Sequence, residues 1–268
     1  MALLEPSLEL GDIKNLWTDS YNGQKAFFVN NTTIIYTCGS IFKFFDIQTK
    51  EISTFIPPTF NSNQGLNAIS LLTANPVINK FAFSETQLFP KVYIYDYDKK
   101  IKEQSVLLDG ADIEYLMIEF SNGEAILTLS AIPNLKVIVW NWMNGQIIAT
   151  INLNESLMYP DFVCFSPTNW RNLTIAYKTE INVWKLEQFD NHRFKTNNTR
   201  LLLPLTDDQV MEEEIGSGFI DEFTYPKNSI ANLPETYEHL VDEILDQRKR
   251  HFLRAICWSN IDEFLIST

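Results

Sequence analysis

The sequence predicts an all-β fold built from a repeated unit of four strands. Three observations lead to this prediction: a strand pattern with a period of about 45 residues, turn residues between the strands, and many aromatic side chains. Aromatic residues make up 13% of the 268 residues, and flat side chains pack well on the pleated surface of a sheet. A period of this length is typical of repeat proteins in which each unit is one small sheet.

The recurring segment alternates β-branched and aromatic residues, and it ends in an aromatic residue followed by a polar one. Its four copies lie at residues 42–46, 92–96, 137–141 and 181–185. Their aromatic anchors are Phe45, Tyr95, Trp140 and Trp184, at intervals of 50, 45 and 44 residues. This is the period of the WD40 repeat, in which an aromatic–Asp pair ends the third strand of each blade. We therefore expect the four anchors to occupy equivalent places between blades.

A second phase of the same repeat supplies the inner strand of each blade, followed by a turn of Ser, Asn, Pro or Gly. Its copies lie at residues 118–123, 163–167 and 256–260. Cys164 and Cys257 occupy the same position of this repeat, where the third blade has Glu119. A catalytic nucleophile would not recur in register with a structural repeat, so these positions indicate packing.

The complete pattern predicts a WD40-type β-propeller of four blades and a partial fifth. The expected blades cover about residues 25–56, 66–107, 113–151 and 161–205, the last finishing at 200–205 after a polar loop. The expected units are blades one to four in 1–205, an acidic insertion in 206–251 and the start of a fifth blade in 252–268. An open ring exposes strand edges, so we expect either a piece of a larger propeller or an edge covered by another chain.

The insertion carries most of the net charge of −13. Residues 206–247 contain twelve acidic residues and one basic residue, Lys227. A helix is expected at 235–250, because Pro234 suits a first turn and apolar residues recur at helical spacing. The apolar face, our candidate partner-binding site, consists of Tyr237, Leu240, Val241, Ile244 and Leu245. A helix this short is marginal in water, so it should dock either on its own propeller or on a partner.

The sequence contains no phosphate-binding glycine loop, no dinucleotide fingerprint, no zinc-protease motif and no nucleophile elbow. We expect no enzyme activity, no cofactor and no metal, and we expect Asp46 and Asp96 to brace turns. The negative charge disfavours nucleic acid. No signal peptide or membrane-spanning stretch is visible, and three widely spaced cysteines favour a reducing compartment.

Several segments resemble one family of ciliary proteins. Residues 33–40 and 44–51 resemble the first blade of ciliary WD40 proteins, and residues 137–142 resemble their third blade. A narrower resemblance comes from residues 165–170, 181–187 and 203–205. Together these segments are similar to the cilia- and flagella-associated protein 43 family and, less closely, to the paralogous protein 44 type.

The resemblance implies a non-catalytic scaffold of the motile-cilium axoneme, part of the tether that holds inner-arm dynein motor domains near the doublet microtubule. The implied partners are a protein 44-type paralogue, inner-arm dynein heavy chains and other axonemal proteins, with neither nucleic acid nor membrane. The implied location is the cytoplasm, cytoskeleton and axoneme of a cilium or flagellum. The alternatives are the paralogous tether subunit, a general WD40 interaction adaptor outside the cilium, and a propeller hydrolase with convergent acids at the channel.

Overall fold

The structure is a computed structural model that describes residues 25–57, 68–98, 103–153, 159–190, 193–204, 250–259 and 263–268. Within these ranges every regular element is a β-strand. Residues 235–249 of the expected helix, including its five apolar residues, lie outside the described residues, so the helix stays a prediction.

Sixteen strands form four antiparallel sheets, each with its strands in sequence order. Blade one contains β1 (Phe27–Phe28), β2 (Thr33–Cys38), β3 (Ile41–Asp46) and β4 (Ile52–Phe55). Blade two contains β5 (Ile69–Asn75), β6 (Lys80–Glu85), β7 (Val92–Asp96) and β8 (Glu103–Leu107). Blade three contains β9 (Tyr115–Phe120), β10 (Ala125–Ser130), β11 (Lys136–Asn141) and β12 (Gln146–Asn152). Blade four contains β13 (Phe162–Phe165), β14 (Asn172–Ala176), β15 (Glu180–Asp190) and β16 (Arg193–Leu202).

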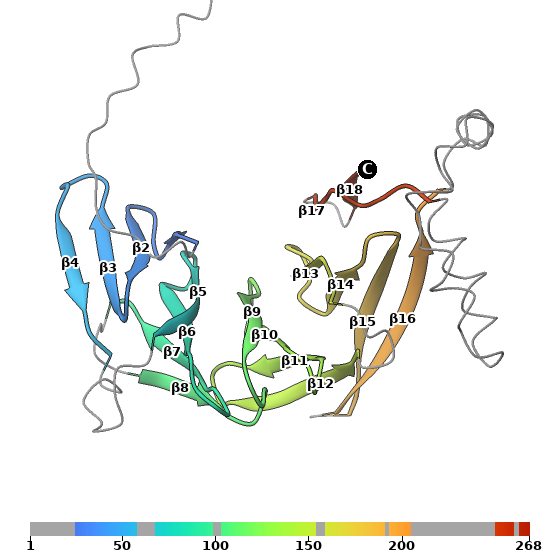
Figure 1. The fold of residues 1–268 in the computed structure, drawn as a ribbon, viewed down its shortest axis with the longest axis horizontal. Helices are drawn as coiled ribbons and strands as arrows, with labels where there is room; N and C mark the ends of the chain where they lie inside the picture. The colour runs from blue at the N-terminus through green and yellow to red at the C-terminus, as the bar shows by residue number, and fades with distance from the viewer. Residues whose placement is uncertain are drawn as a thin grey trace, which may run out of the picture.

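The four sheets follow one another around an arc, as blades do in a β-propeller (Figure 1). The first strand of each blade lies toward the inside of the arc, and β4, β8, β12 and β16 lie toward the outside. A two-stranded sheet of β17 (Ala255–Trp258) and β18 (Phe264–Ser267) follows blade four. The predicted all-β propeller with four blades and the start of a fifth is confirmed.

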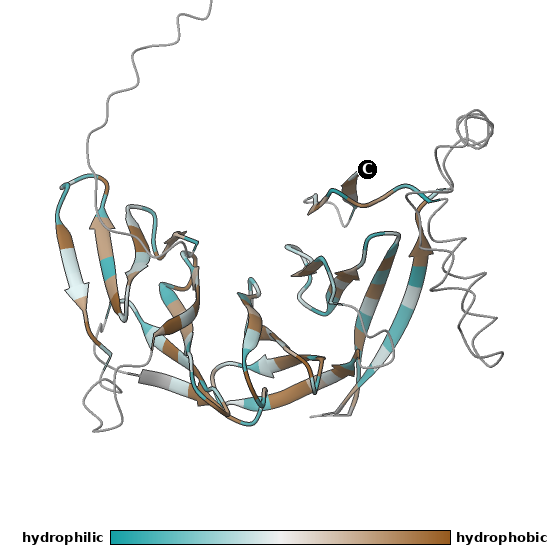
Figure 2. Ribbon diagram, viewed as in Figure 1, coloured by the Kyte–Doolittle hydropathy of each residue, from teal (hydrophilic) through white to brown (hydrophobic). Residues whose placement is uncertain are grey.

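The hydrophobic core lies between blades rather than within one central mass. Three apolar clusters join blade one to two, two to three, and three to four. Because both faces of an interior blade meet a neighbour, the second strands β6 and β10 are buried along their whole length. β10 consequently carries an apolar run from Ala125 to Leu127, whereas β6 buries Lys80, Ser84 and Glu85 as well as Phe81 and Phe83. Figure 2 colours the apolar residues of the blades brown.

The turns between strands use the residues that the sequence indicated. Gly39, between β2 and β3, has a φ of 65°, and Gly145, between β11 and β12, has a φ of 71°. This left-handed conformation is accessible to glycine without the penalty that a Cβ atom brings. Each glycine therefore allows the tight turn that joins its two strands.

Blade four departs from the sequence expectation in its outer half. We predicted a polar loop before a final strand at 200–205, but β15 and β16 form a continuous hairpin of 11 and 10 residues. Residues 193–199 thus belong to β16, and the predicted loop is wrong. Polar side chains such as Asn197 and Thr199 are tolerated there because β16 is the outer strand of its blade.

Candidate interaction surfaces

The polar residue that follows three of the four aromatic anchors braces the next turn. An Oδ1 oxygen of Asp46 accepts hydrogen bonds from the backbone N–H groups of Gln48 (2.8 Å) and Thr49 (3.0 Å), which lower the pKa of the carboxyl group. Asp96 accepts from the N–H of Asp98 at 3.1 Å, and Asn141 accepts from that of Met143 at 3.0 Å. The expected structural role of these carboxylates is confirmed.

The four aromatic anchors occupy equivalent positions in their sheets. In blade three, Phe120, Ile126, Trp140 and Ile147 lie opposite one another across four strands, and Trp140 packs toward blade two. Tyr95 packs in the same way toward blade one, and Trp184 toward blade three. The predicted placement between blades is confirmed for these three.

Phe45 holds the equivalent position in blade one, but its surroundings differ. It lies opposite Ile34 and Ile52, on the other face of β3 from Phe42 and Phe44, which pack toward blade two. Phe45 is half-buried on the face of blade one turned away from blade two. The arc is open on this side (Figure 1), which explains why Phe45 is more exposed than Tyr95 or Trp140.

The inner strands place polar groups at the interfaces between blades. A carboxylate oxygen of Glu119, on β9, accepts a hydrogen bond from the backbone N–H of Phe165 at 3.4 Å. Burial raises the pKa of Glu119 to about 7. Burial, followed by the nearby charge of Glu119, raises the pKa of the Cys164 thiol to about 12. A thiol with such a high pKa is a poor nucleophile at neutral pH, which agrees with a packing role.

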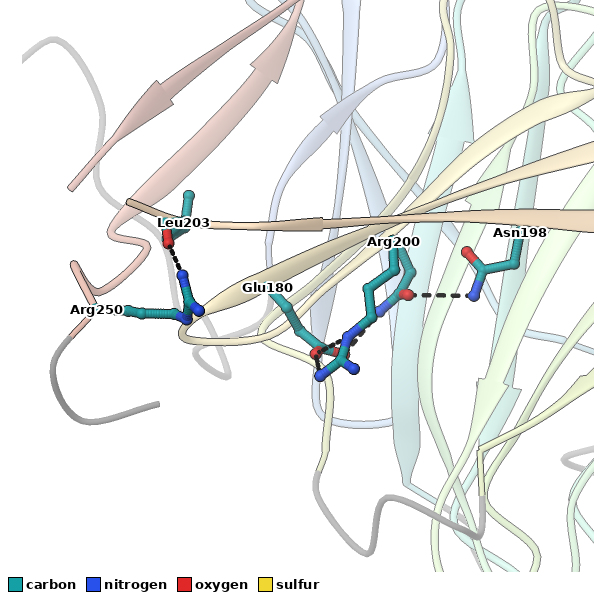
Figure 3. A network of polar contacts seen from close by, with 6 residues as sticks. Glu180, Asn198, Arg200, Leu203 and Arg250 are labelled. Carbon is teal, nitrogen blue, oxygen red and sulfur yellow. Dashed lines mark hydrogen bonds and ion pairs between the residues drawn. The ribbon is translucent and has the colours of Figure 1, made fainter. Parts of the chain in front are cut away.

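The acidic segment leaves blade four and returns to it at almost the same point. Arg250 Nη1 donates to the carbonyl oxygen of Leu203 at 2.8 Å (Figure 3). The backbone N–H of His251 donates to the carbonyl oxygen of Pro204 at 3.0 Å. Beside these contacts, Arg200 Nε donates to Glu180 Oε2 at 2.6 Å. The described residues on the two sides of the acidic segment, Pro204 and Arg250, therefore lie next to each other.

Two hollows are formed among the described residues, and the residues that line them do not form a recognisable set of catalytic groups. One of about 370 Å³ is lined by Asp161, Phe162, Lys178, Phe252, Leu253 and Arg254. The other, of about 270 Å³, lies between blades three and four, where Trp170 and Phe194 pack against Arg171. Among the described residues, no group of three or more His, Cys, Asp or Glu side chains is placed to hold a metal ion.

A set of exposed apolar side chains lies on three loops of blades two and three, and no sequence pattern predicted it. The loops are residues 86–91, 108–114 and 131–135, which we call the loop platform. Its exposed apolar residues are Leu88, Phe89, Leu108, Ile113 and Ile132.

Within the part of the chain that the structure describes, no helix is long and apolar enough to cross a membrane.

Proteins with sequences similar to this chain are known from frog and mouse. No family model matches the chain. It is 26% identical over 260 residues to cilia- and flagella-associated protein 43 of Xenopus laevis, across 93% of this chain and 15% of that protein. The mouse protein of the same name is 24% identical over 200 residues, covering 74% of this chain and 11% of that protein. Mouse cilia- and flagella-associated protein 44 is 28% identical over 160 residues, covering 59% of this chain and 8% of that protein.

Among solved structures, BamB from Moraxella catarrhalis aligns with a TM-score of 0.42 and 12% identity, over 70% of this chain and 53% of that one. Four-stranded blades in sequence order around an arc define the chain as a β-propeller protein. In sequence the chain is similar to cilia- and flagella-associated proteins 43 and 44. The chain spans 15% or less of the length of these relatives.

Proposed function

We propose that this chain is a non-catalytic structural scaffold of the motile-cilium axoneme. The observation that carries the proposal is the similarity to cilia- and flagella-associated protein 43 along 93% of the chain. The names of the relatives support a location in the axoneme of a cilium or flagellum. A propeller suits a scaffold because its blades are rigid and present loops on two faces to several partners.

The finer proposal is that the chain forms part of the tether that holds inner-arm dynein motor domains near the doublet microtubule. Its partners would be a protein 44-type paralogue and inner-arm dynein heavy chains. Blades one to four (1–205) and the start of a fifth (252–268) would form the rigid part. The insertion (206–251) would offer a partner-binding helix with Tyr237, Leu240, Val241, Ile244 and Leu245 as its apolar face.

The net charge of the insertion gives this proposal a physical consequence. Twelve acidic residues against one basic residue create a field that attracts a basic protein surface. Binding through this segment should weaken with added salt, because exposed charges are screened beyond about 8–10 Å at physiological ionic strength. A partner held mainly by apolar contacts would respond to salt far less.

Two other functions remain as alternatives. The 28% identity to protein 44 over 160 residues favours the paralogous tether subunit as the second candidate. The other alternative is a general propeller adaptor that works outside the cilium. The adaptor differs from both tether subunits in where the protein remains after the ciliary membrane is removed.

Fractionation of cilia tests the proposal. A tagged copy expressed in place of the native protein should stay with demembranated axonemes and resist extraction by detergent. The matched control is the same tag on a soluble propeller adaptor, which should be released. If detergent releases the tagged chain completely, the axonemal scaffold is the wrong function and the adaptor alternative gains support.

A further inference from the structure

We propose that the loop platform is a docking site for a protein segment that presents aliphatic or aromatic side chains flanked by lysine or arginine. The proposal is independent of the cellular role proposed above, because such binding is measurable on the isolated chain. It rests on four features of the platform: its topology, its rigidity, its exposed apolar side chains and its charge.

The three loops lie on one face of the propeller. The β6–β7 loop leaves the end of a second strand, the β8–β9 loop the end of a fourth strand, and the β10–β11 loop again the end of a second strand. In an antiparallel blade the second and fourth strands run in the same direction, so all three loops emerge on the same side. Segments from two blades therefore build one surface.

Hydrogen bonds hold the three loops together. The N–H of Phe89 donates to the carbonyl oxygen of Asp112 at 2.8 Å, and the N–H of Ala131 donates to that of Glu114 at 3.0 Å. The side-chain amide of Asn134 donates to the carboxylate of Asp112. These bonds bring the neighbours of Leu88, Ile113 and Ile132 next to one another, so the apolar side chains belong to one surface rather than three.

The middle loop rests directly on the hydrophobic core. A Cβ atom added at Gly110 would overlap the phenol oxygen of Tyr115 and would lie 3.0 Å from Cζ2 of Trp140. Both aromatic side chains are only 2% exposed. A loop seated this closely on buried rings is held in place before any partner arrives, which lowers the entropic cost of binding.

Two apolar side chains of the platform are mostly exposed to solvent. Leu88 is 75% exposed and Phe89 is 68% exposed. Phe89 also has a φ of 52°, a conformation that is rare for a bulky residue and costs free energy unless surrounding contacts maintain it. Single exposed apolar residues are ordinary, whereas five on adjoining loops are typical of an interaction surface.

The charges of the platform select the partner. Its loops carry three acidic residues, Asp109, Asp112 and Glu114, against one exposed basic residue, Lys91. Pro204 and Arg250, which flank the acidic insertion, follow the fourth strand of blade four and therefore lie on the same face. An apolar surface with an acidic rim fits a segment with an apolar centre and basic flanks.

The test uses the whole chain and a phage-displayed library of random 12-residue peptides as the probe. Peptides are selected on the wild-type chain in the presence of an excess of the variant Leu88→Ser/Phe89→Asn. Asn is chosen at position 89 because it tolerates a positive φ better than most residues. The control competitor is Val77→Ser/Met143→Ser, which removes two exposed apolar side chains from turns on the opposite face.

The expected result is a set of enriched peptides with apolar centres and basic flanks. Their affinity should fall at least about tenfold on Leu88→Ser/Phe89→Asn and stay unchanged on the control variant. Asp109→Asn/Glu114→Gln should weaken the same peptides and reduce their salt dependence. Failure to enrich any peptide that depends on Leu88 and Phe89, or enrichment of acidic peptides there, would overturn the proposal.

Discussion

The indole nitrogen of Trp140 donates a hydrogen bond of 2.9 Å to the hydroxyl oxygen of Thr128 on the neighbouring strand, and both side chains are buried. This pair joins the third strand of blade three to its second strand and turns the largest buried side chain toward blade two. Trp140 therefore makes two kinds of contact. It holds its own sheet together and also packs against the blade before it.

Replacement of Trp140 by Ala should therefore lower the free energy of unfolding by about 3–5 kcal/mol, since a large buried side chain is removed from the interface between blades. Denaturant unfolding followed by circular dichroism measures this change. Val77→Ala, at a residue that is 76% exposed, is the matched control and should change the free energy of unfolding by no more than about 0.5 kcal/mol. Equal effects of the two substitutions would contradict the packing described here.

At Gly110, close packing against the core leaves no room for a larger side chain. Gly110→Ala should lower the free energy of unfolding by about 1–3 kcal/mol, because the added methyl group collides with Tyr115 and crowds Trp140. Combining it with Tyr115→Phe removes the phenol oxygen and should recover part of the loss. Thermal unfolding of both variants measures the effect, and an unchanged midpoint for Gly110→Ala would show that the loop is not seated on these rings.

Glu119 gives the stability of the protein a specific pH dependence. Its pKa is raised to about 7, so the folded state binds a proton more tightly than the unfolded state does. Ionisation of Glu119 therefore destabilises the fold above about pH 7, and this penalty disappears as the pH falls toward the ordinary carboxyl value of 4.5. Unfolding of wild type and Glu119→Gln at pH 8 and pH 5 tests this sign.

The variant should be more stable than wild type at pH 8, and the difference should shrink at pH 5. Glutamine keeps an oxygen that can accept the hydrogen bond from the N–H of Phe165, so the comparison isolates the charge. A difference that grows as the pH falls would mean that the carboxylate is stabilised, not penalised, by its surroundings.

The proposed helix of the insertion is open to a separate test. Leu240→Asp combined with Ile244→Asp should release the segment from whatever it docks on, because two buried charges would be costly there. Trypsin should then cleave faster at Arg248 and Lys249, while the unfolding midpoint of the blades stays the same. Unchanged cleavage would refute docking through this apolar face.

The sequence predicted the blades well because each carries its own local signals. The range expected for blade three, 113–151, agrees to within two residues at each end with the observed span from Tyr115 to Asn152. The prediction failed in blade four, where polar residues that form the outer strand β16 look like a loop. Outer strands lack the apolar pattern, since one edge and much of their surface meet water.

The loop platform could not be predicted from the sequence for a different reason. Leu88, Ile113 and Ile132 belong to three loops and are brought together only by hydrogen bonds between those loops. The positive φ of Phe89 has no signature in its residue type, because this conformation is normally adopted by glycine or asparagine. The exposure of these residues depends on packing between blades, which no local pattern encodes.

Electron tomography of axonemes from cells that lack this protein tests the proposed scaffold most directly. If the chain is this scaffold, density beside the inner-arm dynein motor domains should be missing, and these motor domains should lose their fixed position on the doublet. The dynein heavy chains should still hydrolyse ATP, because the chain is proposed to hold a motor and not to take part in its chemistry. Motor domains in their normal place, with no density missing beside them, would contradict the account.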